Sequence, residues 1–528
     1  MKTGLPDINS LSLAQQVAQM VVVRASGYLG DRQRRYPEWE PPAASLQHLV
    51  TDMGVGGVIL LGGSAAEIAL RCQQLQDWAN IPLLIAADIE EGVGQRFAGA
   101  TWFPPPMALS AVARKQPSAA RDYARQMGAF TAREAISLGI NWILAPVVDV
   151  NNNPSNPVIN VRAFGENPEE VSILSSAFIQ GTYPVLTTAK HFPGHGDTDV
   201  DSHLLLPILP HSEARLVEIE LPPFQSAIAS GVDAVMTAHL LIPAWDGEKP
   251  ATLSHAILTG KLRDRLGFTG LIVTDALVMG AIANRYGANE AAVLAVSAGA
   301  DIILMPQNPA EAINAVRAAV EEGRIDKAQI TESVKRIWQA KQKVLTSTYK
   351  SNFTSELAQA DAVSTAEYIL RNAQQGRGCL SVSAGNCRNL IVVDDALNCK
   401  FLGNHTPAIA LPHKLGYQLQ VVDSYTPKTT LETEKHTLLQ IFVRGNPWRG
   451  NAGLNQREIA WFQALVKAEK LQALVIYGSP YILEKIMPEL PPEVPYVFTY
   501  GQMPDAQAIA LSTLRNSKFM QNLKLGNL

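Results

Sequence analysis

The chain has 528 residues, and 44 Lys and Arg side chains against 48 Asp and Glu give it a formal net charge of −4. Because there is no basic excess to neutralise phosphates, we expect neither nucleic acid nor a membrane surface as its partner. With 47% hydrophobic and 17% charged residues, the composition excludes a disordered chain, and the length allows about two to four domains.

The cysteines and the N-terminal residues indicate the compartment. Cys72, Cys379, Cys387 and Cys399 include no CxxC pair, which favours free thiols over a disulfide scaffold or a zinc ribbon. Polar residues interrupt the start of the chain, where a signal peptide needs an unbroken apolar stretch. No run approaches the ~18 apolar residues of a membrane-spanning helix. We therefore expect a soluble, cytoplasmic protein.

Residues 1–345 alternate short apolar runs rich in Val and Ile with longer amphipathic stretches, which is the pattern of parallel βα units. Eight runs predict strands at 19–24, 55–61, 82–88, 141–149, 185–191, 234–241, 270–275 and 300–305. Helices are predicted at 65–79, 117–138, 212–230 and 308–322. Eight such units predict a (β/α)₈ barrel, with an open doubly wound sheet as the alternative fold.

The polar residues of these strands favour the barrel over the open sheet. They fall at or near the carboxyl ends of the apolar runs, where a barrel gathers them at one mouth and an open sheet spreads them along an edge. These residues are Arg24, Asp88, Asp149, Lys190, His191, His239 and Asp275. The sequence therefore predicts chemistry at the carboxyl end of the barrel.

The pattern changes after Val344. Residues 346–375 read as a polar linker followed by a helix. Further apolar runs lie at 389–393, 418–422, 438–443, 473–477 and 496–500, with helices predicted at 456–470 and 505–514. Residues 376–528 are therefore predicted to form a smaller, doubly wound α/β domain.

The densest polar segment, KHFPGHGDTDVDSH at 190–203, follows the fifth predicted strand. Calcium is disfavoured because Ser202 and Ile208 stand where an EF-hand loop needs Gly and Glu. A zinc site through His191, His195 and an aspartate, or a merely solvated acidic loop, are alternatives. The remaining interpretation is a proton-transfer pair, in which an aspartate orients a histidine two residues later in an extended loop. That pair is Asp201 and His203.

Asp275 ends the apolar run 271–273 after one threonine. An unpaired carboxylate is costly to bury, so Asp275 must lie at the strand end, near hydrogen-bond donors or a ligand. It either caps the following helix or acts as a carboxylate nucleophile at the barrel mouth.

The segments KHFPGHG at 190–196, DSH at 201–203 and TDAL at 274–277 resemble glycoside hydrolase family 3, in its β-N-acetylglucosaminidase branch. The resemblance covers about residues 8–344, and members with a trailing α/β domain exist. It implies that Asp275 is the nucleophile and that His203, oriented by Asp201, is the acid/base. It also implies that four residues bind sugar hydroxyls, namely Asp88, Arg162, Lys190 and His191.

Three positions depart from the family pattern. The family's DxEGG stretch reads DIEEGVGQRF at 88–97, with Glu91 for the usual glycine and Val93 for the usual arginine. Asn160 stands where a glycine usually precedes the arginine by two positions. These departures leave the catalytic residues unchanged and concern neighbouring contacts to the sugar or the aglycone.

The resemblance implies retaining hydrolysis of a terminal non-reducing β-linked N-acetylglucosamine (GlcNAc) through a covalent glycosyl-aspartate, without metal or cofactor. It also implies a role in peptidoglycan recycling, on muropeptides. The alternatives are a β-N-acetylglucosaminide phosphorylase, a β-glucosidase and a catalytically silent sugar-binding protein. Trp39 and Trp245 lie in polar loops and are candidates for stacking on a sugar. Nothing in the sequence indicates the oligomeric state.

Overall fold

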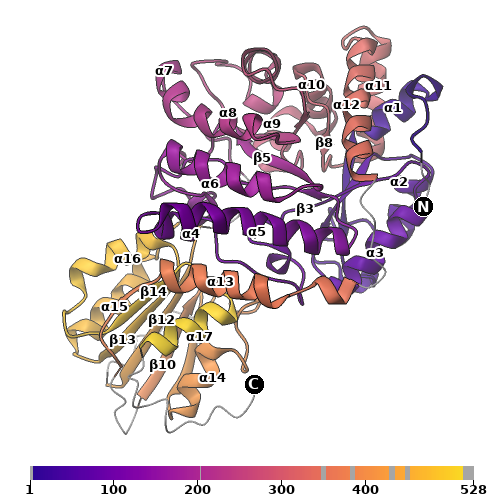
Figure 1. Ribbon diagram of the computed structural model, residues 1–528. Coiled ribbons are helices and arrows are strands. Elements are labelled where there is room, and N and C mark those ends of the chain that lie inside the picture. Colours follow the sequence, from indigo (N-terminus) through magenta and orange to yellow (C-terminus); the bar gives the residue numbers. More distant parts are fainter. Residues whose placement is uncertain are drawn as a thin grey trace.

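Eight parallel strands form a barrel in the computed structural model (Figure 1), which describes residues 4–202, 204–345, 353–380, 387–426, 434–445 and 452–514. The strands are β1 (Val21–Ser26), β2 (Gly57–Leu61), β3 (Leu84–Ala87), β4 (Trp142–Ile143), β5 (Leu186–Phe192), β6 (Ala234–Thr237), β7 (Leu271–Val273) and β8 (Ile303–Leu304). Their order is β7-β6-β5-β4-β3-β2-β1-β8, and a bridge from Val273 to Ile302 closes the ring. The predicted barrel is confirmed.

Helices follow the strands and surround the barrel. They are α1 (Leu13–Gln19), α2 (Ala43–Thr51), α3 (Ala65–Trp78), α4 (Met107–Ala113), α5 (Pro117–Ser137), α6 (Pro168–Gly181), α7 (Glu213–Arg215), α8 (Leu221–Ala229), α9 (Gly280–Tyr286), α10 (Ala288–Ala298), α11 (Pro309–Glu321) and α12 (Lys327–Leu345). Local signals set their starts: Ser64 and Glu67 form a capping box at α3, and proline begins α5, α6 and α11.

Several strands are shorter than predicted, among them β6 (234–241 predicted) and β8 (300–305 predicted), and two elements differ more. The strand predicted at 141–149 pairs regularly only over Trp142–Ile143, because Pro146 has no N–H to donate to a ladder. The helix predicted at 212–230 contains a π-helical segment, Leu216–Glu220, between α7 and α8. Neither difference changes the topology of the barrel.

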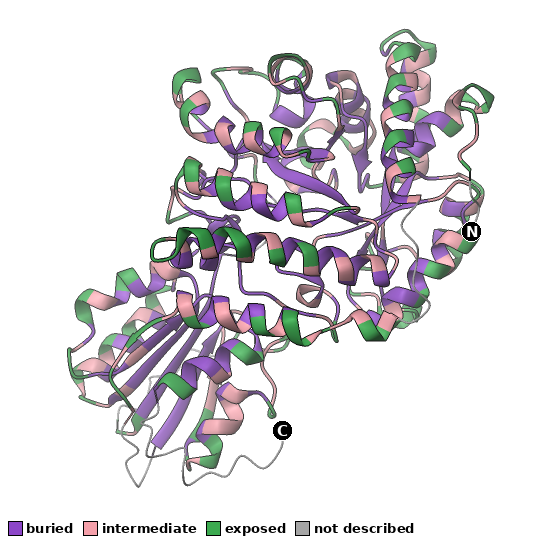
Figure 2. Cartoon of the chain, viewed as in Figure 1, coloured by how far each residue is buried: buried purple, intermediate pink, exposed green. Residues whose placement is uncertain are grey.

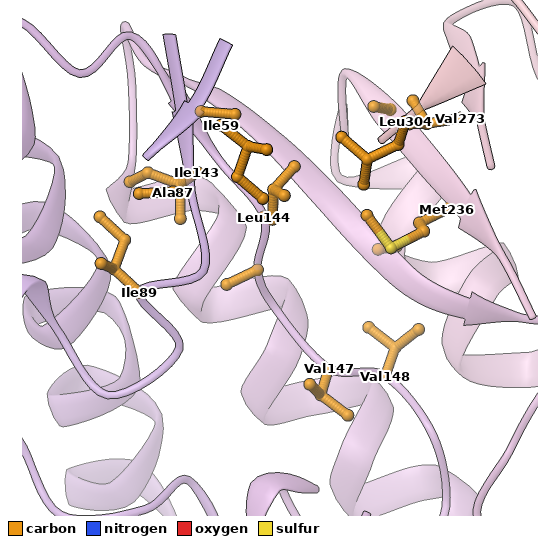
Figure 3. Packing of buried hydrophobic residues seen from close by; sticks show 14 of the residues in the cluster. Ile59, Ala87, Ile89, Ile143, Leu144, Val147, Val148, Met236, Val273 and Leu304 are labelled. Atoms are coloured by element: carbon orange, nitrogen blue, oxygen red, sulfur yellow. The ribbon is translucent and has the colours of Figure 1, made fainter. Parts of the chain in front are cut away.

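Apolar side chains from different strands fill the interior of the barrel (Figure 3). They include Ile59, Ala87, Ile143, Met236, Val273 and Leu304. In Figure 2 the barrel strands and the central strands of the second sheet are buried, whereas exposed residues lie along the outward faces of the helices. Because this interior is a packed core, polar groups that belong to the strands are displaced to the barrel's ends.

The second domain contains a sheet with the order β11-β10-β12-β13-β14-β9. Its strands are β9 (Gln375–Arg377), β10 (Cys387–Val393), β11 (Gln418–Val422), β12 (His436–Val443), β13 (Leu471–Gly478) and β14 (Tyr496–Thr499). Its helices are α14 (Pro407–Lys414), α15 (Gln456–Lys467), α16 (Pro480–Ile486) and α17 (Pro504–Thr513). The smaller α/β domain is confirmed. The sequence did not predict β9, which is short and runs antiparallel to β14.

Helix α13 (Ala360–Ala373) lies between the two sheets, with α4 and α5 on one side and α17 on the other (Figure 1). The ring of Tyr368 on α13 stacks on Tyr123 of α5, with 4.3 Å between ring centroids. Arg133 of α5 pairs with Asp361 of α13 at 3.1 Å. These contacts fix the second domain against the barrel. None of the helices in the described ranges combines the length and hydropathy that a bilayer crossing requires.

Candidate active site

A cavity of about 470 Å³ opens at the carboxyl ends of the barrel strands. From the barrel it is lined by Asp88, Arg162, Lys190, His191 and Asp275, among others. The second domain contributes Asn398, Lys400, Phe401, Arg444 and Gln502. The structure thus brings the predicted nucleophile and the four predicted sugar-binding residues into one cavity, and the second domain completes its wall.

A compact ion network lies at one end of this cavity. Lys190 Nζ on β5 lies 2.8 Å from Asp88 Oδ1 and 2.7 Å from Glu90 Oε1. Arg162 donates to both oxygens of Glu90, from Nε and Nη2, at 2.8 Å each. Although burial opposes ionisation, Arg162 and Lys190 hold the pKa of Glu90 well below 4.5. The network therefore presents fixed, charged hydrogen-bonding groups to a ligand.

Sequence reasoning did not assign Glu90 a role, yet Glu90 bridges both predicted sugar-binding cations. A signal was present, because Asp88 and Glu90 are two residues apart and such side chains share one side of an extended segment. Asp149 was noted only as a polar strand end, and it too has a specific role.

Asp149 is fully buried and holds two histidines, His191 and His195, in place. Its Oδ2 lies 2.8 Å from His191 Nδ1, and its Oδ1 accepts from the backbone N–H groups of His191 and His195 at 3.1 and 2.7 Å. Burial opposes ionisation of Asp149, but the contacts to His191 and His195 lower its pKa. With Nδ1 of His191 donating to the carboxylate, Nε2 of that ring is directed to other partners.

His195 forms hydrogen bonds with Thr198 and Ser202, which lie in the same loop as Asp201. Its Nε2 lies 2.9 Å from Ser202 Oγ and its Nδ1 2.8 Å from Thr198 Oγ1. Asp201 is buried, whereas His203 lies outside the described residues. Because both ring nitrogens of His195 meet hydroxyls, the zinc interpretation finds no support at this residue. Across the described ranges, no three His, Cys, Asp or Glu side chains are grouped as metal ligands.

Replacing His195 by glutamine is expected to make the free energy of unfolding less dependent on pH below about pH 6.5. Burial lowers the pKa of His195 to about 4, so between pH 6.5 and 4 the unfolded chain binds the proton and the folded chain does not. The free energy of unfolding of the wild type therefore decreases as the pH is lowered from 6.5 to 4, and His195 accounts for up to about 3 kcal/mol of this decrease. Urea unfolding at pH 7, 6, 5 and 4.5 measures the effect, and an equal slope in both proteins would contradict it.

Asp275 lies two residues beyond β7, half-buried on the wall of the cavity. Its Oδ1 accepts a hydrogen bond from the backbone N–H of Ala276 at 2.8 Å. The alternative of a helix cap is wrong, because the next helix, α9, begins only at Gly280 with Met279 at its cap position. Asp275 is therefore no helix cap, and it lines the cavity.

Asn160 explains one departure from the family pattern. It opens the 3₁₀ turn η4 (Asn160–Arg162) with φ of 46°, a left-handed conformation that glycine and asparagine tolerate best. Its N–H donates to Asn151 Oδ1 at 2.8 Å. The asparagine thus keeps the backbone conformation that positions Arg162.

We expect Asn160→Ala to destabilise the barrel by about 1–2 kcal/mol, because a Cβ without a polar side chain strains this φ. Asn160→Gly is the matched control and should cost less than about half as much. Thermal unfolding of both variants measures the difference. Equal melting temperatures for the two variants would show that the left-handed backbone is not the reason for asparagine.

Glu91, another departure from the family pattern, connects the domains. Arg444 Nη2, directly after β12, lies 2.7 Å from Glu91 Oε1, and both side chains are buried. Trp102 Nε1 donates to Glu91 Oε2 at 2.9 Å. At a position where the family pattern has glycine, this chain has a carboxylate that forms an ion pair with Arg444 of the second domain. The ion pair places Arg444 in the wall of the cavity.

The two candidate stacking tryptophans differ in position. Trp39 lines the cavity beside Tyr36, 5.8 Å between ring centroids, and Arg24 lies over both rings. Trp245 is not among the residues that line it, and instead lies 5.2 Å from Lys261 Nζ. Of these two tryptophans, Trp39 is therefore the one placed to contact a ligand in this cavity.

The sequence matches known families over both domains. Residues 12–340 match the glycosyl hydrolase family 3 N-terminal domain, and residues 381–516 match the bacterial glycosyl hydrolase family 3 C-terminal domain. A solved family 3 β-N-acetylglucosaminidase from Paenibacillus sp. str. FPU-7 is 31% identical. That structure superposes with a TM-score of 0.77, over 96% of this chain and 97% of the other.

Curated relatives match a smaller part of the chain. The beta-hexosaminidase A of Pseudoalteromonas piscicida is 35% identical over 63% of this chain and 62% of its own length. The beta-N-acetylglucosaminidase/beta-glucosidase of Cellulomonas fimi is 33% identical over 55% of this chain and 53% of its own length. The match with this chain thus spans about half to three fifths of these two proteins.

Proposed function

The chain belongs to glycosyl hydrolase family 3, and from this premise we propose that it releases terminal, non-reducing β-linked GlcNAc with retention of configuration. One observation carries the proposal: Asp275 shares a cavity with the Asp88, Glu90, Lys190 and Arg162 network. A carboxylate in reach of the anomeric carbon and a set of charged groups for hydroxyls are what a retaining glycosidase requires. The likeness to a solved β-N-acetylglucosaminidase along nearly the whole chain supports the choice of sugar.

The proposed reaction has two steps. A carboxylate oxygen of Asp275 attacks the anomeric carbon while His203 gives its proton to the leaving oxygen, so that the glycosidic bond breaks and a glycosyl-aspartate forms. Water, deprotonated by His203, then attacks the same carbon and frees Asp275. During both steps the sugar hydroxyls are held by Asp88, Arg162, Lys190 and His191.

The acid/base role assigned to His203 departs from the carboxylic acid that most glycosidases use. Its support is indirect: Asp201 is buried two residues earlier, and Ser202 is tethered to the buried His195 at 2.9 Å. The acid/base group of a glycosidase must come within hydrogen-bond reach of the leaving oxygen, and the assignment of this role to His203 rests on the DSH segment at 201–203.

Hydrolysis of 4-nitrophenyl β-GlcNAc beside the β-glucoside, with and without inorganic phosphate, tests the proposal. We expect faster release from the GlcNAc substrate, no dependence on phosphate, and a loss of about 10²- to 10⁴-fold in His203→Ala. His413→Ala, in the second domain, is the matched control. Preferential cleavage of the glucoside would favour a β-glucosidase, and GlcNAc 1-phosphate as product would favour a phosphorylase.

We further propose that the natural substrate is a peptidoglycan fragment with GlcNAc linked to N-acetylmuramic acid (MurNAc) or its anhydro form, cleaved in the cytoplasm during recycling. The KHFPGHG and DSH segments support this role, as do four cysteines that remain free thiols. Deletion of the gene should cause GlcNAc-anhydro-MurNAc to accumulate in the cytosolic fraction, measured by mass spectrometry. An unchanged level would contradict the role but not the activity.

A further inference from the structure

The active-site cavity continues along the boundary between the domains. A second cavity of about 590 Å³ shares Gln95, Arg96, Trp102 and Lys400 with it. Arg35 of the barrel and Met503 of the second domain line the part farther from the network. The two cavities are therefore neighbours, and a ligand larger than one sugar can extend from the first toward the second.

The cations on this path differ in their pairing. In the active-site cavity, four cations each have a carboxylate within about 3.2 Å: Arg24 with Glu40, Arg162 with Glu90, Lys190 with Asp88, and Arg444 with Glu91. For Arg35, Arg96 and Lys400, the described residues provide no carboxylate within ion-pair distance. Arg96 uses its Nε to donate to the Asp88 carbonyl oxygen at 2.8 Å. These three cations therefore form an excess of positive charge where the two cavities meet.

Lys400 owes its position to the topology of the second sheet. The strand order runs β11-β10-β12-β13, so the connection after β10 and the connection after β12 run in opposite directions, and the order reverses between β10 and β12. In open α/β sheets, ligands bind outside the carboxyl ends of the strands at such a reversal. Lys400 lies in the connection after β10 and Arg444 directly after β12. The second domain thus presents its own ligand-binding edge to the barrel mouth.

The electrostatics of Lys400 support an anionic ligand. Desolvation of its ammonium group, together with the positive charges of Arg35 and Arg96, lowers the pKa of Lys400 to about 8. Asp505 is the acidic residue among the described residues that line the second cavity. Burial and the negative charge of Glu367 raise the pKa of Asp505, which favours its neutral form. A bound anion would relieve the repulsion among the three cations.

We propose that Arg35, Arg96 and Lys400 form a subsite for a carboxylate on the aglycone, the part of the substrate beyond the bond that is cleaved. The proposal rests on the proposed function, because an enzyme that removes a terminal sugar leaves only the aglycone to extend from the cavity. The sugar occupies the ion-paired end, beside Asp88 and Lys190, and the aglycone follows the wall of unpaired cations. The second domain is in this way a determinant of specificity.

The matched substrates are GlcNAc-β-1,4-MurNAc and GlcNAc-β-1,4-GlcNAc, which differ by one lactyl carboxylate. We expect wild type to favour the first, and the ratio of the two kcat/KM values to fall about 3- to 10-fold in Lys400→Gln, mainly through KM. Arg35→Gln/Lys400→Gln should lower the ratio further. Lys467→Gln, an exposed lysine at the end of α15, is the control and should keep the wild-type ratio.

Added NaCl gives a second readout, because exposed charges are screened over about a Debye length. The wild-type preference for the MurNAc disaccharide should shrink between 20 and 300 mM NaCl, and more than in Lys400→Gln. If Lys400→Gln and Arg35→Gln/Lys400→Gln both kept the wild-type ratio of the two kcat/KM values, the proposed subsite would be overturned. Formation of GlcNAc 1-phosphate, lost in Lys400→Gln, would instead assign the cations to free phosphate and also overturn it. If wild type released GlcNAc from neither disaccharide nor the 4-nitrophenyl glycoside, the proposed function itself would fail.

Discussion

Replacement of Asp275 by alanine is expected to lower kcat for 4-nitrophenyl β-GlcNAc by about 10⁴-fold or more, the scale seen when a covalent nucleophile is removed. Asp275 lies half-buried on the cavity wall, in the loop that follows β7, and its Oδ1 accepts a hydrogen bond from the neighbouring Ala276 N–H. The alanine variant should therefore remain folded, with a melting temperature close to that of wild type.

External azide distinguishes loss of the nucleophile from general damage. A small anion can enter the space that the carboxylate leaves and attack the anomeric carbon from the same side, giving the α-glycosyl azide while the activated aglycone departs. Asp264→Ala, an exposed aspartate in the π-helical segment Ala256–Arg265, is the control and should keep wild-type kcat. Full activity in Asp275→Ala, or α-glycosyl azide from the control, would contradict the assignment.

Replacement of Glu90 by glutamine is expected to destabilise the barrel by about 3–5 kcal/mol, because two buried cations, Lys190 and Arg162, lose their common counter-charge. For a domain of the barrel's size this corresponds to a fall in melting temperature of about 6–15 °C. We also expect kcat/KM to fall about 10- to 100-fold, since the two cations would no longer be oriented toward the sugar.

Glu213 offers a matched control, because it also pairs with two cations, Lys261 and Arg265, but on the surface. Glu213→Gln should change stability by less than about 1 kcal/mol. The pH dependence gives a second check. Glu90 has a depressed pKa, so its stabilisation is present above pH 4.5 and is lost as pH falls below it. The stability difference between wild type and Glu90→Gln should therefore be constant above about pH 5 and shrink below 4.5, and a constant difference throughout would argue against the ion network.

The sequence was a good guide to the elements because their signals are local. Runs of Val and Ile, such as 271–273, predict strands wherever they occur, and Ser64 with Glu67 marks a helix start without knowledge of distant residues. Strand-end polar residues such as Asp88 and Lys190 then had to share a mouth once eight strands closed into a barrel. Where a backbone property decided, as in the π-helical segment Leu216–Glu220 or the short β4, the prediction was less accurate.

Local signals in the sequence were enough to predict the two folds, the polar mouth of the barrel and most of the residues that meet there. The pairing of their charges became visible in the folded chain: Glu90 with Lys190 and Arg162, Asp149 with His191, and Glu91 with Arg444 of the other domain. Strand and helix signals act between neighbours in the chain. Ion pairs form instead between side chains that folding brings within 3 Å from positions tens to hundreds of residues apart, and no periodicity encodes them.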